Sequence, residues 1–561
     1  MKWTTRLLVL AVLIGGLVCF HIVRSHRPLR VNEATKEDIL LLGNATELST
    51  LDLHVATGQP EHMVFAALFE GLVAPDPANP DKPAPGAASS WETQDSIHWT
   101  FHLRKNGRWS DGAPLTAHDF VWSYQRILTP ELAAQYASML FPLKNAEEFN
   151  KGTLKDFSQV GIKAIDDYTL ELTLVGPMPY LLGMMKHYSW FPVPRHVIEK
   201  FGSYTDRANR WTKAGNLVGN GPFALQEWRF THSLTVLKNP YYWDAEVVRL
   251  KKIVFVPIAS DTTEERAFRD GQIHSTFTLP NPLIQEYAKN RKDVLTSEPI
   301  LSVYFYRINT TREMLKDVRV RKALSLAIDR DGIINNILRA GQKPSEGLTP
   351  YPESLDYPQA PKVIRFDPAE AQRLMAEAGY PGGKGFPKFD ILINTHEAHR
   401  VIAEAVQEMW RKNLGIQVGI FNQDWGVYLE SQRQMNYDVC RAAWGGDYPD
   451  PLTFLSMWKT GDGNNETGWS NAKFDDLINQ SNQEADATKR LNLLGQAETI
   501  LLEEMPIIPF YWYVHVYASR PELKGRVPSV LQHRAYKGWY LDHSVLNQPA
   551  TVADPVPAPA P

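Results

Sequence analysis

The stretch SIHWTFHLRKNGRWSDGAPLTAHDFVWSY (residues 96–124) indicates a strand, a turn and a helix in direct succession. Its first half alternates apolar and polar residues with a period of two, which is the pattern of a half-buried strand. The apolar positions are Ile97, Trp99, Phe101 and Leu103. Its second half begins a helix, because the Thr116 hydroxyl and the Asp119 carboxylate can accept hydrogen bonds from the free N–H groups of a first turn. The helix carries Phe120, Val121 and Tyr124.

The same mixture of strand and helix patterns continues along the body of the chain. Further strands are predicted around Leu170, Leu172, Leu174, Leu234, Val236, Ile253 and Phe255. Helical spacing occurs at Val401, Ile402, Ala405, Val406, Met409 and Trp410, and Gly415 ends it. No internal repeat is visible. A chain of 561 residues is long enough for about three to five structural units, so we expect α/β lobes with several sheets.

Composition excludes some classes of function. The formal net charge is −4, whereas a nucleic-acid surface needs a clustered basic excess, so no nucleic-acid partner is expected. Aromatic residues make up 11% of the chain, and some of them are expected to line a ligand cleft. The body contains one cysteine, Cys440, which cannot form an intramolecular disulfide there and is expected to be a buried small apolar residue.

The two ends differ from the body. Lys2 and Arg6 precede an uncharged run at residues 7–23, and basic residues follow it. This pattern indicates export, and the run lies at the lower limit of a membrane-spanning helix. Residues 1–25 are therefore expected to be a signal or an N-terminal membrane anchor, with a linker at 26–36. The C-terminal segment at 549–561 is rich in proline and is expected to be a disordered tail.

Motifs for catalysis or metal binding are lacking. The sequence has no nucleophile elbow, phosphate-binding loop, zinc-protease motif or paired C-x-x-C. His396 and His399 stand three residues apart, whereas a helical zinc pair needs four. The glycine-rich turn at 382–385 lacks the spacing of a phosphate loop. We therefore expect no enzyme activity, metal or cofactor.

One segment favours recognition of a ligand. WGGDYPDP (residues 444–451) follows an apolar run and begins with two glycines, which permit close approach of a backbone to a ligand. Arg441 and Asp447 flank these glycines. The spacing alone allows two interpretations. In one, these two side chains contact a ligand; in the other, they are solvated or paired with each other.

Several ordered motifs resemble those of one family. These are WSDGAPLTAHDF (109–120), NGPF (220–223), NPYYW (239–243), DVRVRKAL (317–324) and DRD (329–331). They are similar to the signatures of family-5 extracytoplasmic solute-binding proteins of ABC importers, and within the family to members that bind oligopeptides. The resemblance extends from about residue 38 to 543.

This resemblance implies a class II periplasmic-binding-protein fold, with two lobes joined by a hinge near 298 and 515 and an additional inserted domain. The implied boundaries are lobe I at 37–70, 196–297 and 515–548, domain II at 71–195, and lobe III at 298–514.

The resemblance also implies a site in which a peptide lies extended between the lobes as an added strand. Backbone bonds are expected from Thr57, Gly58 and Gln59 on one side and from Ala443, Trp444 and Gly445 on the other. Asp447 corresponds to the group that binds the α-ammonium. Tyr136 and Trp425 correspond to aromatic residues near the peptide. Arg441 and His399 correspond to groups that receive the carboxylate.

Two departures from the family pattern affect this site. Leu338, with Arg339 beside it, stands where a lysine of the carboxylate set is expected, so tetrapeptide capture is in doubt. Ser302 and Gly445 stand where a lobe disulfide would be, which implies a different source of stability.

The predicted function is capture of short peptides in the periplasm or at the outer face of the cytoplasmic membrane. The expected partners are a peptide and ABC permease subunits, and the chain is expected to be a monomer. Two alternatives keep the fold. One is binding of murein peptide or another amine-bearing solute, and the other is a membrane-tethered peptide sensor or chaperone that feeds no transporter.

Overall fold

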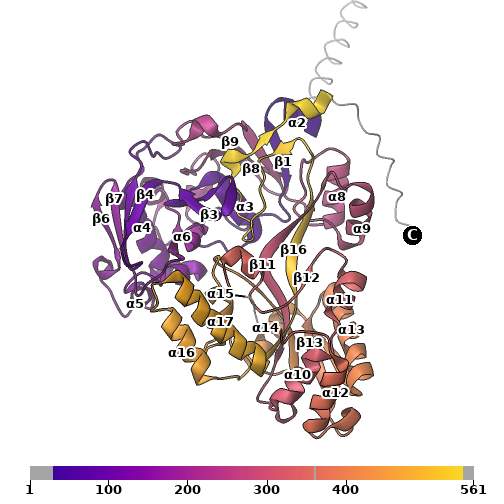
Figure 1. Cartoon of the computed structure of the whole chain (residues 1–561). Helices are drawn as coiled ribbons and strands as arrows, with labels where there is room; N and C mark the ends of the chain where they lie inside the picture. Colours follow the sequence, from indigo (N-terminus) through magenta and orange to yellow (C-terminus); the bar gives the residue numbers. More distant parts are fainter. Residues whose placement is uncertain (1–28, 359–361, 548–561) are drawn as a thin grey trace, which may run out of the picture.

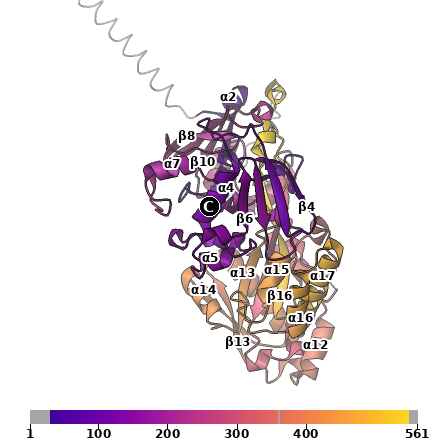
Figure 2. The same ribbon diagram turned by 90° about the vertical axis from the view of Figure 1, so that its left-hand side faces the viewer.

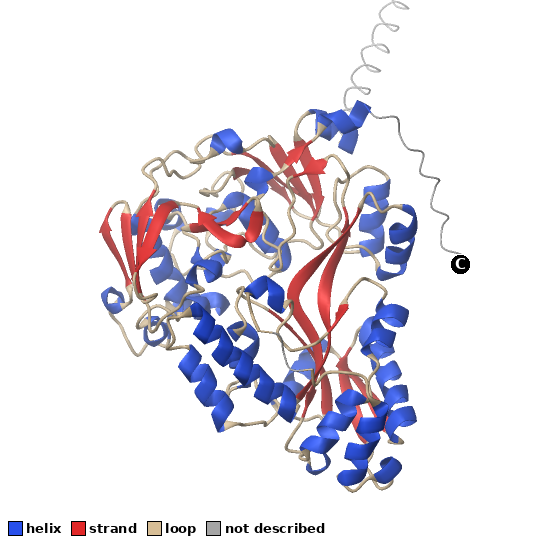
Figure 3. Ribbon diagram, viewed as in Figure 1, coloured by secondary structure: helices blue, strands red, loops and turns tan. Residues whose placement is uncertain are grey.

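The computed structural model describes residues 29–358 and 362–547. The chain forms two lobes, and a smaller domain lies beside the first lobe (Figures 1 and 2). Each body has its own sheet with helices packed around it (Figure 3). The predicted α/β fold with two lobes and an inserted domain is confirmed.

Lobe I is built on a four-stranded sheet in the order β1-β10-β9-β8. Its strands are β1 (Ile39–Gly43), β10 (Lys252–Val256), β9 (Ser233–Lys238) and β8 (Phe223–Arg229). Its described helices are α2 (Val31–Lys36), α3 (Gln59–Leu68), α7 (Arg195–Ile198), α8 (Asp261–Arg269) and α9 (Asn281–Asn290). A short hairpin pairs β17 (Leu523–Lys524) with β18 (Tyr540–Leu541). Because β1 pairs in parallel with β10 from a remote part of the chain, lobe I is discontinuous in sequence.

Domain II contains the sheet β4-β5-β7-β6 and the hairpin β2-β3. Its strands are β2 (Val73–Asp76), β3 (Asn79–Pro85), β4 (Ala88–Thr93), β5 (His98–Leu103), β6 (Ile162–Asp166) and β7 (Thr169–Thr173). Its described helices are α4 (Ala117–Leu128), α5 (Ala146–Asn150) and α6 (Leu181–Met184). The capping box predicted at Thr116 and Asp119 is present at the start of α4.

Lobe III contains a six-stranded sheet in the order β12-β16-β11-β15-β13-β14. Its strands are β11 (Leu295–Ile308), β12 (Lys343–Pro344), β13 (Phe389–Asn394), β14 (Val418–Gln423), β15 (Val439–Gly445) and β16 (Ile507–Ala518). Its described α-helices are α10 (Val318–Leu326), α11 (Arg330–Ile333), α12 (Pro368–Glu377), α13 (Glu397–Leu414), α14 (Trp425–Arg433), α15 (Leu452–Leu455), α16 (Ala472–Ser481) and α17 (Ala487–Glu504). Gly415 ends α13 in the left-handed conformation, as predicted.

Two long strands connect the lobes. β11 and β16 run side by side from lobe I into lobe III (Figure 1), and their pairing is irregular between Pro299 and Val303. Glu298 lies opposite His515 in this register and is fully buried, with Arg526 and Arg534 at 3.8 and 3.6 Å. Burial raises the pKa of Glu298, but the hydrogen bond with His515 and the charges of the two arginines outweigh it and hold the pKa at about 2. The predicted domain boundaries near 298 and 515 fall within these strands and remain predictions.

Several predictions concern single residues and the chain ends. Cys440 is a free, buried thiol, as expected. The predicted anchor and the proline-rich tail lie outside the described residues. Within residues 29–358 and 362–547, no helix has both the length and the apolar character that a membrane span requires.

Candidate functional site

In lobe III, the last residues of β15 have one edge that no other described strand pairs with. β15 pairs with β11, and beyond this pairing the Gly446 N–H donates to the Leu301 carbonyl at 2.7 Å. Hydrogen-bonded pairs alternate along antiparallel strands, so Ala443 and Gly445 direct their N–H and C=O groups away from β11. On that other side β13 pairs with β15 only as far as Cys440. The backbone groups of Ala443 and Gly445 therefore face an edge that no described strand covers.

The predicted Gly445 lies on this edge, whereas the backbone groups of Trp444 are directed toward β11. Gly445 is exposed, and a Cβ built on it would meet no atom within 4 Å. Trp444 accepts a hydrogen bond from the Ser302 hydroxyl at its carbonyl, at 3.0 Å. Ser302 and Gly445 are cross-strand partners, so the two residues that stand where the family's lobe disulfide would be lie opposite each other.

Asp447 lies just beyond the end of β15. Its N–H donates to the Thr453 hydroxyl at 3.2 Å, and its carboxylate forms no ion pair with any described residue. The side chain is exposed in the open cleft, yet the surrounding protein displaces enough water to raise its pKa to about 6. Burial and then the Asp447 charge raise the pKa of Tyr136 in domain II. Asp447 therefore lies near enough to Tyr136 for its charge to act on the phenol.

Arg441 is buried in β15 without an acidic partner among the described residues. Its guanidinium donates to Asn394 Oδ1 at 3.4 Å and to the Tyr513 hydroxyl at 3.2 Å, and it lies 5.0 Å from the centre of the Tyr304 ring. Its Nε has no hydrogen-bond partner among the described groups. Arg441 and Asp447 thus do not pair with each other.

His399 in α13 lies close to Arg441. Burial, the Arg441 charge and the His396 charge lower the pKa of His399 to about 3, so its ring is neutral near pH 7. Its Nδ1 has no hydrogen-bond partner within the described part of the chain. The rings of His396 and His399 are 4.6 Å apart, but the described residues contain no group of three metal-binding side chains.

The opposite wall comes from lobe I and domain II. Thr57 and Gln59 are exposed, and Gly58 between them is extended at the start of α3. Tyr188 donates to the Ala56 carbonyl at 3.0 Å, and its ring packs 5.9 Å from that of Tyr136. Gln59 also donates to Gln532 Oε1 at 2.8 Å. The predicted residues of this wall therefore form one continuous surface.

Three remaining positions complete the description of the predicted site. Leu338 is buried in the core of lobe III. Arg339 is exposed, with φ of 53°, and donates to the carbonyl of Asn336 in its own helical turn. The side chain of Trp425 is outside what the structure describes.

The sequence interpretation missed the aromatic residues around Arg441. Tyr304, Tyr511 and Tyr513 surround its guanidinium, and the Tyr304 and Tyr511 rings stack 4.9 Å apart. Tyr511 and Tyr513 alternate along β16, so a period-two aromatic pattern was the available signal.

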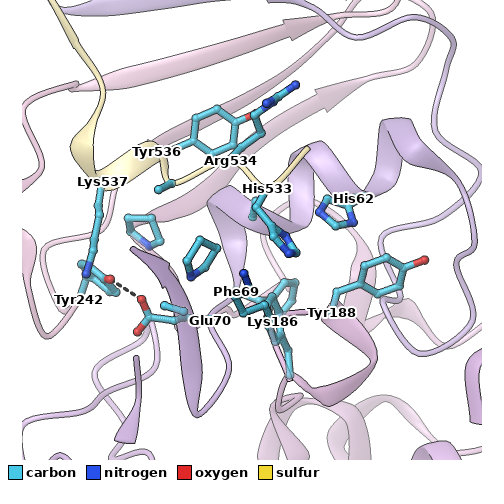
Figure 4. A pocket seen from close by; sticks show the side chains of 16 residues that line it. His62, Phe69, Glu70, Lys186, Tyr188, Tyr242, His533, Arg534, Tyr536 and Lys537 are labelled. Carbon is cyan, nitrogen blue, oxygen red and sulfur yellow. Dashed lines mark hydrogen bonds between the residues drawn. The ribbon is translucent and has the colours of Figure 1, made fainter. Parts of the chain in front are cut away.

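A separate pocket lies among residues of lobe I and domain II (Figure 4). Glu70 lines it and accepts hydrogen bonds from Tyr242 and Trp243. Lys186 also lines it, donates to two backbone carbonyls, and has its pKa lowered to about 8 by burial. None of the predicted site residues lines this pocket. Glu70 and Lys186 thus bond neutral groups, whereas His533 Nε2 and both terminal nitrogens of Arg534, which also line the pocket, have no hydrogen-bond partner among the described residues.

Comparisons with known proteins agree with this geometry. The profile of bacterial extracellular solute-binding proteins, family 5, matches residues 82–466. The periplasmic oligopeptide-binding protein OppA of Salmonella typhimurium is 37% identical over 506 residues, which are 89% of this chain and 91% of that protein. The periplasmic murein peptide-binding protein MppA of Escherichia coli is 35% identical, over 85% of this chain and 88% of that protein.

Solved structures of related proteins superpose on this chain. An unliganded open form of the murein tripeptide-binding protein MppA superposes with a TM-score of 0.80 and 33% identity, covering 91% of this chain and 98% of that one. Haemophilus influenzae OppA in complex with RPPGFSPFR superposes with a TM-score of 0.73 and 33% identity, covering 90% of this chain and 99% of that one. In this chain Gly445 and Asp447 are both exposed. On sequence, fold and cleft together, the chain belongs to the bacterial extracellular solute-binding proteins of family 5.

Proposed function

We propose that this protein captures short peptides between its lobes and delivers them to an ABC importer. One observation carries the proposal: the uncovered edge of β15 lies between a cation, Arg441, and a carboxylate, Asp447, neither of which forms an ion pair with a described residue. An extended peptide offers backbone groups to the edge and opposite charges at its two ends. Buried or partly buried charges without counter-ions are costly in a protein and favour a ligand that supplies them.

The spacing limits the length and direction of the ligand. Arg441 and Asp447 are six residues apart, which spans at most about 20 Å of extended chain. A peptide whose two ends meet these charges is therefore limited to about six residues. With its ammonium at Asp447 and its carboxylate at Arg441, the peptide runs antiparallel to β15. His399, neutral and next to Arg441, can share the carboxylate.

The relatives support the choice of ligand and partner. The names of OppA and MppA specify oligopeptides and murein peptides, and one solved relative holds RPPGFSPFR. We infer a location in the periplasm or at the outer face of the cytoplasmic membrane, with the N-terminal segment as an anchor. The protein acts as a monomer and a binding protein without catalysis, and its partners are the permease subunits of the importer.

Calorimetry of the full-length protein in detergent tests this function. Trialanine should bind the wild-type protein. The Asp447→Asn substitution should raise the dissociation constant for trialanine by about two to three and a half decades, because breaking a buried ion pair costs about 3–5 kcal/mol. N-acetyl-trialanine should bind the wild-type protein more weakly than trialanine by a similar factor. The loss of affinity caused by acetylation and the loss caused by Asp447→Asn should not add, because both remove the same interaction. Asp293→Asn makes the same change at an exposed site in lobe I and should have no effect. Additive losses, or tight binding of the acetylated peptide by wild type, contradict the assignment.

Two alternatives have distinct outcomes. The TM-score of 0.80 with a murein tripeptide-binding protein favours murein peptide as the second candidate ligand, and tighter binding of murein tripeptide than of trialanine would select it. A membrane-tethered sensor or chaperone would bind peptides equally well. It would fail to restore peptide uptake when expressed with the importer in a strain that lacks its own binding protein.

A further inference from the structure

Domain II touches lobe III at the loop that carries Asp447. Tyr180, which precedes α6, stacks on Tyr448 with ring centres 5.3 Å apart and planes 14° from parallel. Next to this stack the chains approach closely, because a Cβ added to Gly183 would lie 2.8 Å from Pro449 Cγ. A residue adjacent in sequence to Asp447 is thus held by the inserted domain.

The stack continues into a buried ion pair of lobe III. The Arg490 guanidinium lies 4.3 Å from the centre of the Tyr180 ring. It also donates to both carboxylate oxygens of Asp450, at 2.6 and 2.9 Å. Arg490 and Asp450 are buried, so this pair is rigid and desolvated. Tyr180 therefore packs against a fixed group of lobe III as well as against Tyr448.

The loop at 446–451 is anchored at its two ends by lobe III itself. Gly446 donates to the Leu301 carbonyl at 2.7 Å at one end, and Asp450 pairs with Arg490 at the other. Between these ends, the ring of Tyr448 rests on Tyr180. The Asp447 carboxylate has no described ion-pair partner that could orient it, so its place depends on the backbone, which the bond from the Asp447 N–H to the Thr453 hydroxyl and the neighbouring Tyr448 ring both hold.

We propose that Tyr180 is a positioning residue of the α-ammonium site, through which domain II keeps Asp447 in place while the cleft is open. The inference rests on the proposed function and gives the inserted domain a role in ligand recognition. Pre-organisation of the loop lowers the ordering cost of binding.

The test measures how strongly each variant prefers a free over an acetylated N-terminus. The full-length protein in detergent is titrated with trialanine and with N-acetyl-trialanine. Tyr180→Ala should lower the affinity for trialanine about tenfold, which is the upper range for an aromatic pair. Its affinity for the acetylated peptide should stay within about twofold of the wild-type value. Tyr180→Phe keeps the stack and should restore wild-type affinity. Tyr180→Ala combined with Asp447→Asn should bind no more weakly than Asp447→Asn alone.

Controls separate positioning from general damage to the fold. Tyr204→Ala removes another ring, which packs on Trp122 at 5.8 Å, and should leave both affinities unchanged. If Tyr180→Ala does not fold, Tyr180→Leu keeps apolar volume without a ring face and should show the same selective loss. Equal losses for both peptides, or no loss for either, overturn the role of Tyr180. Failure of wild type to bind any peptide instead overturns the proposed function.

Discussion

Asp447 should make peptide affinity depend on pH in a calculable way. Its pKa is raised to about 6 because the protein displaces water and no described basic side chain offsets this. Only the ionised carboxylate pairs with the ligand's ammonium, so affinity is present above pH 6 and is lost as pH falls through that value. With the carboxylate ionised throughout in the complex, the dissociation constant should rise about tenfold between pH 7 and pH 5.

Neither end of the ligand nor the neighbouring His399 titrates in this window. A peptide α-amino group has a pKa of about 7.7–8.0 and an α-carboxyl group about 3.3–3.7, so both ends stay charged. His399, with a pKa of about 3, stays neutral. The Asp447 step should therefore dominate.

Isothermal titration of trialanine at pH 7, 6 and 5 measures this dependence. The affinity of the wild-type protein for trialanine should fall about tenfold between pH 7 and pH 5. The Asp447→Asn variant should bind weakly, and its affinity should not change with pH. A flat wild-type profile would refute the reasoning, and so would an equal slope in the Asn variant, because the titrating group would then lie elsewhere.

Three further predictions concern single side chains. Arg441→Met should weaken trialanine about tenfold or more, as expected for hydrogen bonds to a charged group, but should leave C-terminally amidated trialanine unchanged in calorimetry. Arg126→Met removes the partner of buried Asp52, now 2.6 Å away, and should lower the free energy of unfolding in urea by about 3–5 kcal/mol; Arg126→Met with Asp52→Leu should recover part of this loss. Gly415→Ala places a Cβ at φ 71° and 2.4 Å from a carbonyl oxygen, which should cost about 1–3 kcal/mol in the same assay. Gly463→Ala, where nothing lies within 4 Å, should be neutral.

Local features of the fold could be predicted from the sequence. The alternation that ends at Leu103 became β5, the capping box at Thr116 begins α4, and Gly415 ends α13. Each of these depends on residues within a few positions along the chain, since periodicity and caps are properties of one turn or one strand. The ordered family motifs likewise led to the two-lobed fold.

The site required the tertiary structure. From the sequence, Arg441 and Asp447 could contact a ligand, or be solvated or paired with each other, and the structure shows that they are not paired. The uncovered edge exists because β13 leaves β15 at Cys440, which no local pattern reveals. The contact between Tyr180 and Tyr448 joins positions from separate bodies of the molecule.

The physical reason for this division is the range of the interactions. A residue's preference for strand, helix or cap acts through bonded neighbours, so it is written in short stretches of sequence. Pairing of strands, stacking of rings and the burial of a charge depend on which surfaces meet after the chain has folded. The sequence therefore determined the elements and the family of this protein, and the packing of its lobes decided which side chains face the cleft.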